Sequence, residues 1–230
     1  MEKEKLLDIK DLSVTYKTED GIVYAVNNLN LTLEPKETLG FVGETGAGKT
    51  TTAMTIMGLL PTPPGKVTSG EIMFDGKDML KIGDKERRGI LGEKISMIFQ
   101  DPMTSLNPLF TIGNQITEAI LTHQKMTKAE AKKRAVEMLK LVGIPSPEKR
   151  YESFPHEFSG GMRQRAMIAM ALSCEPDLLI ADEPTTALDV TIQAQVLSLM
   201  KELNERLGTA TILITHNLGC ASSICDKIIV

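Results

Sequence analysis

A glycine-rich stretch early in the chain has the residue types and the spacing for binding phosphate. Residues 43–50 read GETGAGKT and fit the pattern G-x-x-x-x-G-K-[ST]. The three glycines let the backbone turn tightly, so that successive N–H groups point inward and form an anion site at the positive end of a helix. Lys49 would reach the β- and γ-phosphates of a triphosphate, and the Thr50 hydroxyl would hold Mg²⁺. The stretch therefore predicts a triphosphate site.

A pair of acids, Asp182 and Glu183, forms the second candidate site. They follow the apolar run Leu178 to Ala181, which is typical of a buried parallel strand. Next to a phosphate loop, an acid at the end of a second strand helps to hold the metal, and Asp182 fits that role directly or through water. Glu183 is well placed to polarise an attacking water as a general base. Surface charge is the alternative, which the apolar run disfavours.

A third stretch, residues 159–161, can start a helix. Ser159 can be its N-cap, and the two glycines leave the first amides open to a second anion. The residues alone fit an ordinary capped helix equally well. His216 follows an apolar run near the expected site, so we predict a functional role for it and interpret the other two histidines as structural.

Hydrophobic patterning predicts the elements that position these residues. A helix at 51–60 follows the phosphate loop. Asp189 is a good N-cap for a helix that ends at Leu207, before Gly208. Turn residues between short β-prone runs predict antiparallel strands at the start of the chain and a hairpin at 70–76. The predicted strands are 12–16, 22–26, 29–33, 38–42, 95–99, 178–182 and 211–215.

Residues 103–158 have a different pattern, which predicts a helical insert between two strands of the main sheet. Residues 112–123 can form one helix, and a capping box at Thr127-Lys128-Ala129-Glu130 opens a second. Gly143 is placed to end that second helix. We interpret the run Lys132-Lys133-Arg134 as a solvated helix face rather than a binding patch.

Composition limits the possible partners. The 230 residues carry a net charge of −4 with a pI near 5.5, which argues against nucleic acid as a partner. No apolar run reaches the ~18 residues of a spanning helix, and no signal peptide follows Met1. Three cysteines without C-x-x-C spacing predict buried, reduced thiols. Residues 227–230 begin a strand that stops at Val230, so we expect the fold to continue in a longer protein.

The stretch from Ser159 to Gln164 resembles the signature motif of ATP-binding cassette (ABC) proteins. The family's other motifs occur in the family's order over nearly the whole chain. Residues 43–50 resemble Walker A and residues 178–182 resemble Walker B. The remaining resemblances are Gln100 to the Q-loop glutamine, Glu183 to the catalytic glutamate, Ala187-Leu188-Asp189 to the D-loop, His216 to the switch histidine and Tyr16 to the aromatic residue that stacks on adenine.

The resemblance implies a role for each motif in binding and hydrolysing ATP. The implied catalytic residues are Glu183, His216 and Gln100, and the implied Mg²⁺ ligands are Thr50, Gln100 and Asp182. The implied contacts with ATP on a second subunit are Ser159, Gly160, Gly161 and Gln164, with Asp189 in the D-loop. The implied contacts with ATP on the same subunit are Tyr16, for which Tyr24 is the alternative stacking ring, and Gly43, Glu44, Thr45, Gly46, Ala47, Gly48, Lys49, Thr50 and Thr51.

The implied fold is α/β: a P-loop NTPase (RecA-like) core with an N-terminal antiparallel β layer and an inserted α-helical subdomain. Residues 1–100 and 174–230 would form the core with the β layer. Residues 101–173 would form the helical subdomain with the signature motif. The whole would be a single ABC nucleotide-binding domain, truncated at its C-terminus.

Within the family, residues 99–108 and 182–191 look most like the ATPase subunits of bacterial oligopeptide, dipeptide and nickel importers. Residues 57–61 are similar to the first of the two non-identical ATPases that such importers often carry. The implied partners are a second ATPase subunit, identical or sister, in a head-to-tail dimer, transmembrane permease subunits and, indirectly, an extracellular solute-binding protein. The implied location is the cytoplasmic face of the cell membrane. Asn217 departs from the aspartate expected after the switch histidine.

Other functions remain to be separated from this one. A P-loop kinase would explain the phosphate loop and Asp182 but would leave residues 159–161 and His216 without roles. A cassette ATPase of DNA repair would carry long coiled coils between Walker A and Walker B, and no sustained heptads occur there. An inactive nucleotide-sensing module would be expected to lack the acid at position 183.

Overall fold

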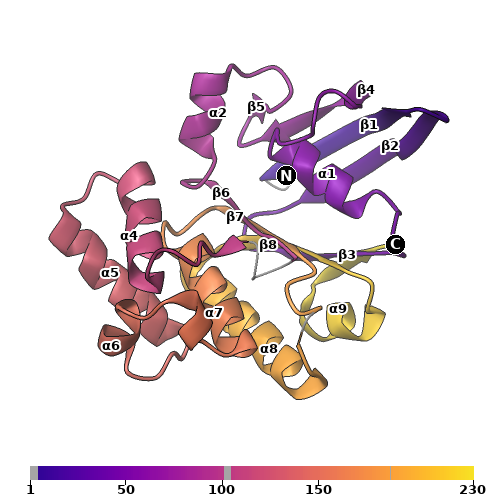
Figure 1. The fold of residues 1–230 in the computed structure, drawn as a ribbon. Helices are drawn as coiled ribbons and strands as arrows, with labels where there is room; N and C mark the ends of the chain where they lie inside the picture. The colour runs from indigo at the N-terminus through magenta and orange to yellow at the C-terminus, as the bar shows by residue number, and fades with distance from the viewer. Residues whose placement is uncertain (1–4, 101–104, 187) are drawn as a thin grey trace. The chain divides into compact units, whose positions relative to one another are not determined.

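The computed structural model describes residues 5–100, 105–186 and 188–230. These residues form two compact units (Figure 1). The first takes its residues from Met1–Leu91 and Ala210–Val230, and the second from Gly92–Thr209. Residues 101–104 of the Q-loop stretch and Ala187 of the D-loop lie outside the described residues. The helical subdomain at 101–173 stays a prediction.

An antiparallel sheet in the first unit has the strand order β2-β1-β4-β5. We expected three short strands before residue 34, but β1 and β2 are long and pair from Leu7↔Leu33 to Thr18↔Gly21. Asn28, which interrupts the apolar pattern, has a φ of 44° within β2, beside a shift of the β1–β2 register. The break in the pattern is therefore an irregularity within one strand, not a turn. The strands are β1 (Leu7–Thr18), β2 (Gly21–Leu33), β4 (Gly65–Phe74) and β5 (Lys77–Asp78).

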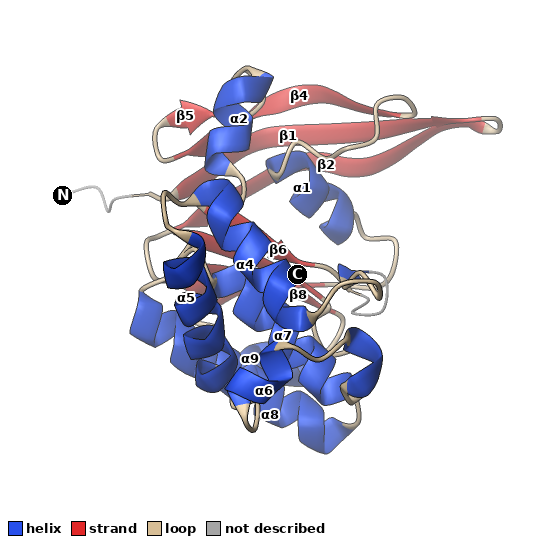
Figure 2. Ribbon diagram, turned by 60° about the vertical axis from the view of Figure 1, so that its left-hand side comes forward, coloured by secondary structure: helices blue, strands red, loops and turns tan. Residues whose placement is uncertain are grey.

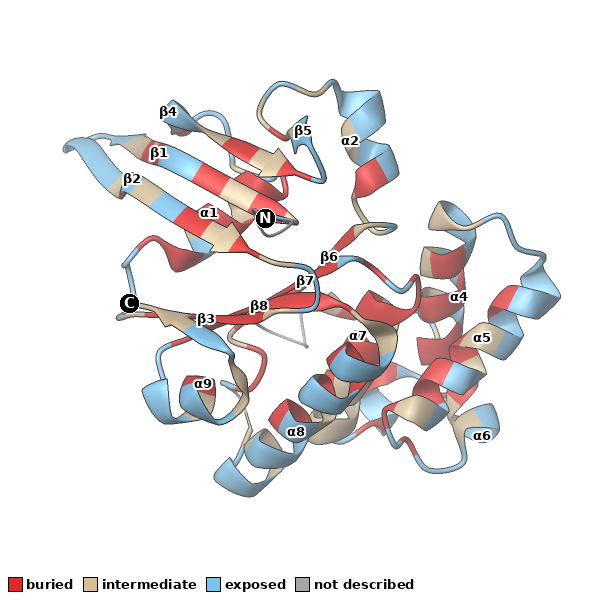
Figure 3. Cartoon of the chain, turned by 180° about the vertical axis from the view of Figure 1, so that it is seen from behind, coloured by how far each residue is buried: buried red, intermediate tan, exposed pale blue. Residues whose placement is uncertain are grey.

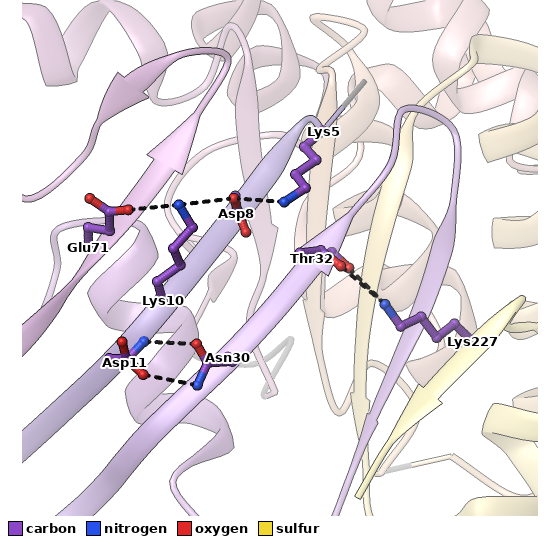
Figure 4. Close-up of polar contacts among 8 residues, drawn as sticks. All are labelled: Lys5, Asp8, Lys10, Asp11, Asn30, Thr32, Glu71 and Lys227. Carbon is purple, nitrogen blue, oxygen red and sulfur yellow. Dashed lines mark hydrogen bonds and ion pairs between the residues drawn. The ribbon is translucent and has the colours of Figure 1, made fainter. Parts of the chain in front are cut away.

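Polar side chains join the exposed parts of these strands (Figure 4). The Lys10 ammonium on β1 lies 3.1 Å from the Glu71 carboxylate on β4 and 3.7 Å from that of Asp8. The hydrogen bond and the charge of Glu71 raise the pKa of Lys10. On β9 (Lys227–Ile229), Lys227 donates a hydrogen bond of 3.2 Å to the Thr32 carbonyl of β2. Exposed pairs of this kind add little stability.

Strand β3 (Thr38–Val42) is the central parallel strand of the first unit. It pairs with β8 (Ala210–Thr215) on one side and with β9 on the other. All of its residues are buried, as expected for an apolar run in a parallel sheet (Figure 3). Helix α1 (Lys49–Ile56) begins seven residues after β3 and ends earlier than predicted, because Gly58 turns the chain with a φ of 65°. Helices α2 (Asp84–Ile90) and α9 (Leu218–Ile224) complete the described elements of this unit.

The second unit combines two parallel strands with helices (Figure 2). Strands β6 (Ile95–Ile98) and β7 (Leu178–Asp182) pair from Ile95↔Leu178 to Ile98↔Ala181. The predicted helix at 112–123 is confirmed as α4. The helices are α4 (Ile112–His123), α5 (Lys128–Leu141), α6 (Pro147–Tyr151), α7 (Gly160–Leu172) and α8 (Val190–Leu207), with a 3₁₀ turn at Pro155–Glu157.

The predicted capping box opens α5 as expected. The Thr127 hydroxyl accepts a hydrogen bond from the Glu130 N–H at 3.3 Å, and the Glu130 carboxylate accepts one from the Thr127 N–H at 2.8 Å. The apolar side of the helix, including Ala131, Ala135 and Met138, is buried. Within the described parts of the chain, no helix has both the length and the apolar character needed to cross a membrane.

Candidate functional site

The phosphate loop runs from the end of β3 to the start of α1. Gly46 and Gly48 have φ values of 89° and 80°, which residues with a side chain rarely adopt. A Cβ on Gly48 would lie 2.1 Å from the Ala25 carbonyl oxygen of β2, so this position also requires a close backbone approach. Gly43 differs from our expectation, because its φ lies outside the left-handed region and a Cβ there would meet Ala47 at 3.4 Å. The tight turn therefore depends on Gly46 and Gly48.

Lys49 closes the loop from within. Its side chain is 6% exposed, and its Nζ donates hydrogen bonds to the carbonyls of Gly43 at 2.7 Å and Glu44 at 2.8 Å. The ammonium is therefore held at the start of the loop that α1 follows. Thr50 is exposed in the first turn of α1, and its hydroxyl is an oxygen of the kind that binds Mg²⁺.

Two tyrosines lie near this loop in different ways. The Tyr16 hydroxyl donates a hydrogen bond of 3.5 Å to Thr51 Oγ1 on α1. Tyr24 is 66% exposed and lines a hollow of about 590 Å³ with loop residues including Gly46 and Lys49. Pairing of Thr15 with Tyr24, and of Tyr16 with Val23, puts the two tyrosines on opposite faces of the β1–β2 pair.

Some of the residues that line this hollow were not predicted from the sequence. Ala25, Val26 and Asn27 of β2 line it. No motif marks these positions, because they reach the loop only through the strand pairing and through the close approach of Ala25 to Gly48.

In the second unit, strand register brings two predicted residues together. Because Ile98 pairs with Ala181, β6 and β7 end side by side. Gln100 Nε2 donates a hydrogen bond of 3.1 Å to Glu183 Oε2, although the two residues come from different motifs. Glu183 has a φ of 45°. Asp182 is 4% exposed at the end of β7.

Thr186 is a residue of this site that sequence reasoning missed. Its hydroxyl donates a hydrogen bond of 2.8 Å to Glu183 Oε2. The two residues are three positions apart in the sequence, and a turn closed by a hydrogen bond of 3.3 Å from the Thr186 N–H to the Glu183 carbonyl brings their side chains together. A hydroxyl residue shortly after a candidate base is the only hint in the sequence.

The signature stretch begins α7 as predicted. Ser159 is the N-cap, and its hydroxyl accepts a hydrogen bond from the Met162 N–H at 3.3 Å. Gly160 and Gly161 are half-buried in the first turn, and a Cβ on Gly161 would lie 3.0 Å from Ile192 on α8.

Gln164 differs from the other residues of that stretch. Its side chain is 2% exposed, and its Nε2 has no hydrogen-bond partner among the described residues. Such burial does not fit the direct contact with a second subunit that we expected. Asp189 is the N-cap of α8, where its Oδ1 accepts a hydrogen bond of 3.0 Å from the Ile192 N–H.

His216 follows β8 in the first unit and is exposed. Asn217, the departure from the family pattern, is the N-cap of α9 and accepts a hydrogen bond of 3.1 Å from the Cys220 N–H. Asparagine and aspartate cap helices about equally well, so the departure preserves the local structure. The candidate residues thus form two groups: Tyr16, Lys49, Thr50 and His216 in the first unit, and Gln100, Ser159, Asp182, Glu183 and Asp189 in the second.

The cysteines are free thiols, as predicted, but only Cys174 is buried, whereas Cys220 and Cys225 are partly exposed. Burial raises the pKa of Cys174 and raises that of Cys225 to about 11. Both thiols therefore stay protonated near neutral pH and are poor nucleophiles.

Comparison with known proteins identifies the family. A model of the family described as ABC transporter matches residues 26–186. The chain belongs to this ABC transporter family. It is 56% identical over 226 residues to the oligopeptide transport ATP-binding protein OppD of Bacillus subtilis (strain 168), which covers 98% of this chain and 63% of OppD. It is 55% identical over 227 residues to the dipeptide transport ATP-binding protein DppD of the same organism, covering 99% of this chain and 68% of DppD.

Solved ABC structures have the same fold. A dimeric structure of a post-hydrolysis state of the ATP-binding cassette MJ0796, bound to ADP and Pi, matches with a TM-score of 0.84 and 32% identity over 97% of this chain and 93% of that one. The predicted α/β fold of the P-loop NTPase type is thereby confirmed. This ABC chain spans 63% of the length of the Bacillus OppD that it matches.

Proposed function

We propose that this ABC chain is the ATP-binding and ATP-hydrolysing subunit of an importer of oligopeptides or dipeptides, held at the cytoplasmic face of a bacterial membrane by separate transmembrane subunits. The observation that carries the proposal is the 56% identity to a named oligopeptide transport subunit over 98% of the chain. The MJ0796 cassette, which binds ADP and Pi in a post-hydrolysis state, supports ATP as the substrate.

ATP binding would use the first unit. The backbone N–H groups of residues 43–49 and the positive end of α1 would surround the phosphates. Lys49 Nζ, now bonded to the carbonyls of Gly43 and Glu44, would exchange these neutral acceptors for phosphate oxygens, a stronger charge-assisted bond. The ring of Tyr16 would stack on the base, with its hydroxyl tied to Thr51.

Hydrolysis would use the acids of the second unit. The Glu183 carboxylate would take a proton from a water molecule as that water forms a bond to the γ-phosphorus and the bond to ADP breaks. His216 would hydrogen-bond the γ-phosphate in the closed state. The proton would leave Glu183 after phosphate departs, which restores the carboxylate.

The donors suit a hard cation. A hydroxyl on Thr50, an amide oxygen on Gln100 and a carboxylate on Asp182 are the oxygen ligands that Mg²⁺ prefers, so these three residues would hold it. Gln100 uses its Nε2 on Glu183, and the oxygen at the other end of the same amide would serve as the ligand. Bound Mg²⁺ would neutralise charge on the phosphate oxygens.

A head-to-tail dimer would complete the site. Ser159, Gly160 and Gly161 start α7, whose first N–H groups and hydroxyl would bind the γ-phosphate of ATP held by the second subunit. ATP would then join two surfaces that ADP cannot, and hydrolysis would separate them. The dimeric state of the matching ABC cassettes supports this arrangement. Asp189 is the N-cap of α8, which lies beside the start of α7. Gln164 is buried within α7 and would act on this helix start from the protein interior.

The variant Glu183→Gln tests the ATPase. It keeps the shape of the side chain but removes the proton acceptor, so phosphate release from Mg-ATP should fall by roughly 10²–10⁴-fold while ATP affinity is kept. The variant should also sediment as a dimer with Mg-ATP and as a monomer with Mg-ADP. Near-normal phosphate release would remove Glu183 from this role. ADP formation that requires an added acceptor, without release of phosphate, would favour a kinase.

The same variant tests the transport assignment in cells. The full-length protein should restore uptake of a labelled tripeptide to bacteria that lack their own OppD, and Glu183→Gln at the same expression level should not. If the purified protein releases phosphate from ATP but does not restore uptake in the cells, the chain would be a cassette ATPase with a role outside peptide transport.

A further inference from the structure

Two side chains in the described part of the protein donate hydrogen bonds to the same oxygen of the Glu183 carboxylate. Gln100 Nε2 donates to Oε2 at 3.1 Å, and Thr186 Oγ1 donates to the same Oε2 at 2.8 Å. The donors come from opposite directions in the chain, one from the end of β6 and one from the loop after β7. The carboxylate is therefore held in place through Oε2.

We propose that Thr186 is a positioning residue for hydrolysis, whose hydroxyl fixes the Glu183 carboxylate through Oε2 so that the carboxylate stays directed at the attacking water. This inference rests on the proposed function, in which Glu183 is the general base. Thr186 does not touch ATP or the water in this proposal. It acts through Glu183 alone.

Thr186 is better suited than Gln100 to hold the carboxylate throughout a reaction cycle. Its bond is the shorter of the two, and a hydroxyl bound to an ionised acceptor is among the stronger hydrogen bonds. Its branched side chain has restricted rotation, so little freedom is lost when the bond forms. Gln100 is exposed after the neighbouring strand. In the proposed function its amide oxygen would also serve as a cation ligand.

The loop that carries Thr186 is itself held firmly. The Leu188 N–H donates to the Thr185 carbonyl at 3.1 Å, and Gln193 Nε2 on α8 donates to the Thr185 hydroxyl at 2.8 Å. The two successive threonines therefore have different roles. The Thr185 hydroxyl joins the loop to α8 by a hydrogen bond, and the Thr186 hydroxyl orients the Glu183 carboxylate.

The backbone of Glu183 explains why such support is needed. Its φ of 45° lies in the left-handed region, which a residue with a Cβ rarely adopts. That conformation turns the side chain away from the direction that a continuing strand would give it, and it persists only where surrounding contacts hold it. The hydrogen bonds from Thr186 are such contacts.

Two substitutions of Thr186 separate the hydroxyl from the shape. Thr186→Val keeps the branched side chain and removes the donor, whereas Thr186→Ser keeps the donor. Thr186 is exposed, so neither change opens a cavity. For Thr186→Val we expect kcat for phosphate release to fall about 10–100-fold, the worth of a hydrogen bond to a charged group, with the KM for ATP unchanged. Thr186→Ser should restore most of that loss.

A double variant shows whether the effect passes through the carboxylate. In the Glu183→Gln background, Thr186→Val should cause no further loss of kcat, because residues that act as a unit are not additive. Thr122→Val is the matched control, since Thr122 is exposed on α4 and its hydroxyl donates only to the Glu118 carbonyl of its own helix. This control should keep wild-type kcat and KM.

The outcomes distinguish this inference from the proposed function. A wild-type protein that releases no phosphate overturns the proposed function and this inference with it. Wild-type turnover together with undiminished turnover of Thr186→Val overturns only the role of Thr186. The role is also overturned if the serine variant is as slow as the valine variant, or if the loss recurs in full without the Glu183 carboxylate.

Discussion

Two loops that follow parallel strands are shaped by different forces in this molecule. The phosphate loop after β3 takes its form from the backbone, because Gly46 and Gly48 have φ values of 89° and 80° that glycine adopts without strain. The loop after β7 has a left-handed residue too, but it is Glu183, with a φ of 45°, and side-chain hydrogen bonds from Gln100 and Thr186 support it.

The charged groups of the two loops differ in the same way. Lys49 Nζ bonds to carbonyls five and six residues away, so the phosphate loop contains its own partners. Glu183 bonds to Gln100 across 83 residues of sequence, a contact that exists only because β6 and β7 pair in one register. The first loop is therefore encoded locally, and the second depends on the fold around it.

Gly48→Ala should have the largest effect on stability, because the phosphate loop approaches the backbone of β2 closely at this glycine. The new Cβ would lie 2.1 Å from the Ala25 carbonyl and would also occupy a φ of 80°. Left-handed strain and overpacking together predict a loss of about 2–5 kcal/mol in the free energy of unfolding. Urea denaturation measures this loss.

Gly46→Ala is the matched control for that experiment. Gly46 also has a left-handed backbone conformation, but nothing lies within 4 Å of a Cβ built there. Its substitution should therefore lower the free energy of unfolding only by the backbone strain, about 1–2 kcal/mol. Equal losses in the two variants would mean that the approach of Ala25 does not restrict the loop.

Local encoding also decides how much of the structure could be predicted from the sequence. The N-caps Thr127, Ser159 and Asp189 were predicted and confirmed, because each accepts a hydrogen bond from an N–H three residues ahead. The phosphate loop, the strand before it and the helix after it were also predicted, because residues close together in the sequence determine their structure. Helix α6 was missed, because the sequence analysis predicted no helix after Gly143, although Pro147 stands in the first turn of α6, where proline is tolerated.

Contacts between distant segments were less accessible to sequence reasoning. Gln100 and Glu183 were predicted from separate motifs, but nothing in either motif predicts their hydrogen bond. Thr186 was passed over because a threonine after an acidic pair has no distinctive spacing. The expectation that Gln164 contacts a second subunit was made from the motif alone, and its 2% exposure depends on packing that the motif does not contain.

Tyr16 and Tyr24 are the two candidates for the aromatic ring that stacks on the base of ATP. Tyr16 and Tyr24 lie on opposite faces of the β1–β2 pair, and Tyr16 contacts Thr51 on the helix that follows the phosphate loop. We therefore expect Tyr16→Ala to weaken ATP binding by the worth of one stacked base, about 1–3 kcal/mol, and Tyr24→Ala to leave it nearly unchanged. Titration calorimetry in the Glu183→Gln background measures both. The reverse order of effects would assign the base to the hollow that Tyr24 lines.

The capping box of α5 shares one property with each of the two loops. Its residues are close together in the sequence, as in the phosphate loop, and it is held by side-chain hydrogen bonds, as in the loop after β7. Thr127→Ala removes the cap and should lower the free energy of unfolding at pH 7 by about 1 kcal/mol. Hydrogen bonds from the Thr127 side chain and then from its backbone hold the pKa of Glu130 below its ordinary value of 4.5. A carboxylate with a lowered pKa in the folded state stabilises the fold fully above its unfolded pKa and loses that contribution as the pH falls through the folded value.

The cost of Thr127→Ala should therefore be largest near neutral pH and should shrink as the pH falls through the lowered pKa of Glu130, because a protonated carboxyl group accepts weaker hydrogen bonds from Thr127 than the carboxylate does. Urea denaturation at a series of pH values measures the difference between the two proteins. Glu130→Gln is the control, since a neutral side chain can still accept the Thr127 N–H but does not titrate, and the cost of Thr127→Ala in that background should not vary with pH. A cost that stays constant in the wild-type background would mean that the hydroxyl, and not the charge of Glu130, carries the stability of this helix start.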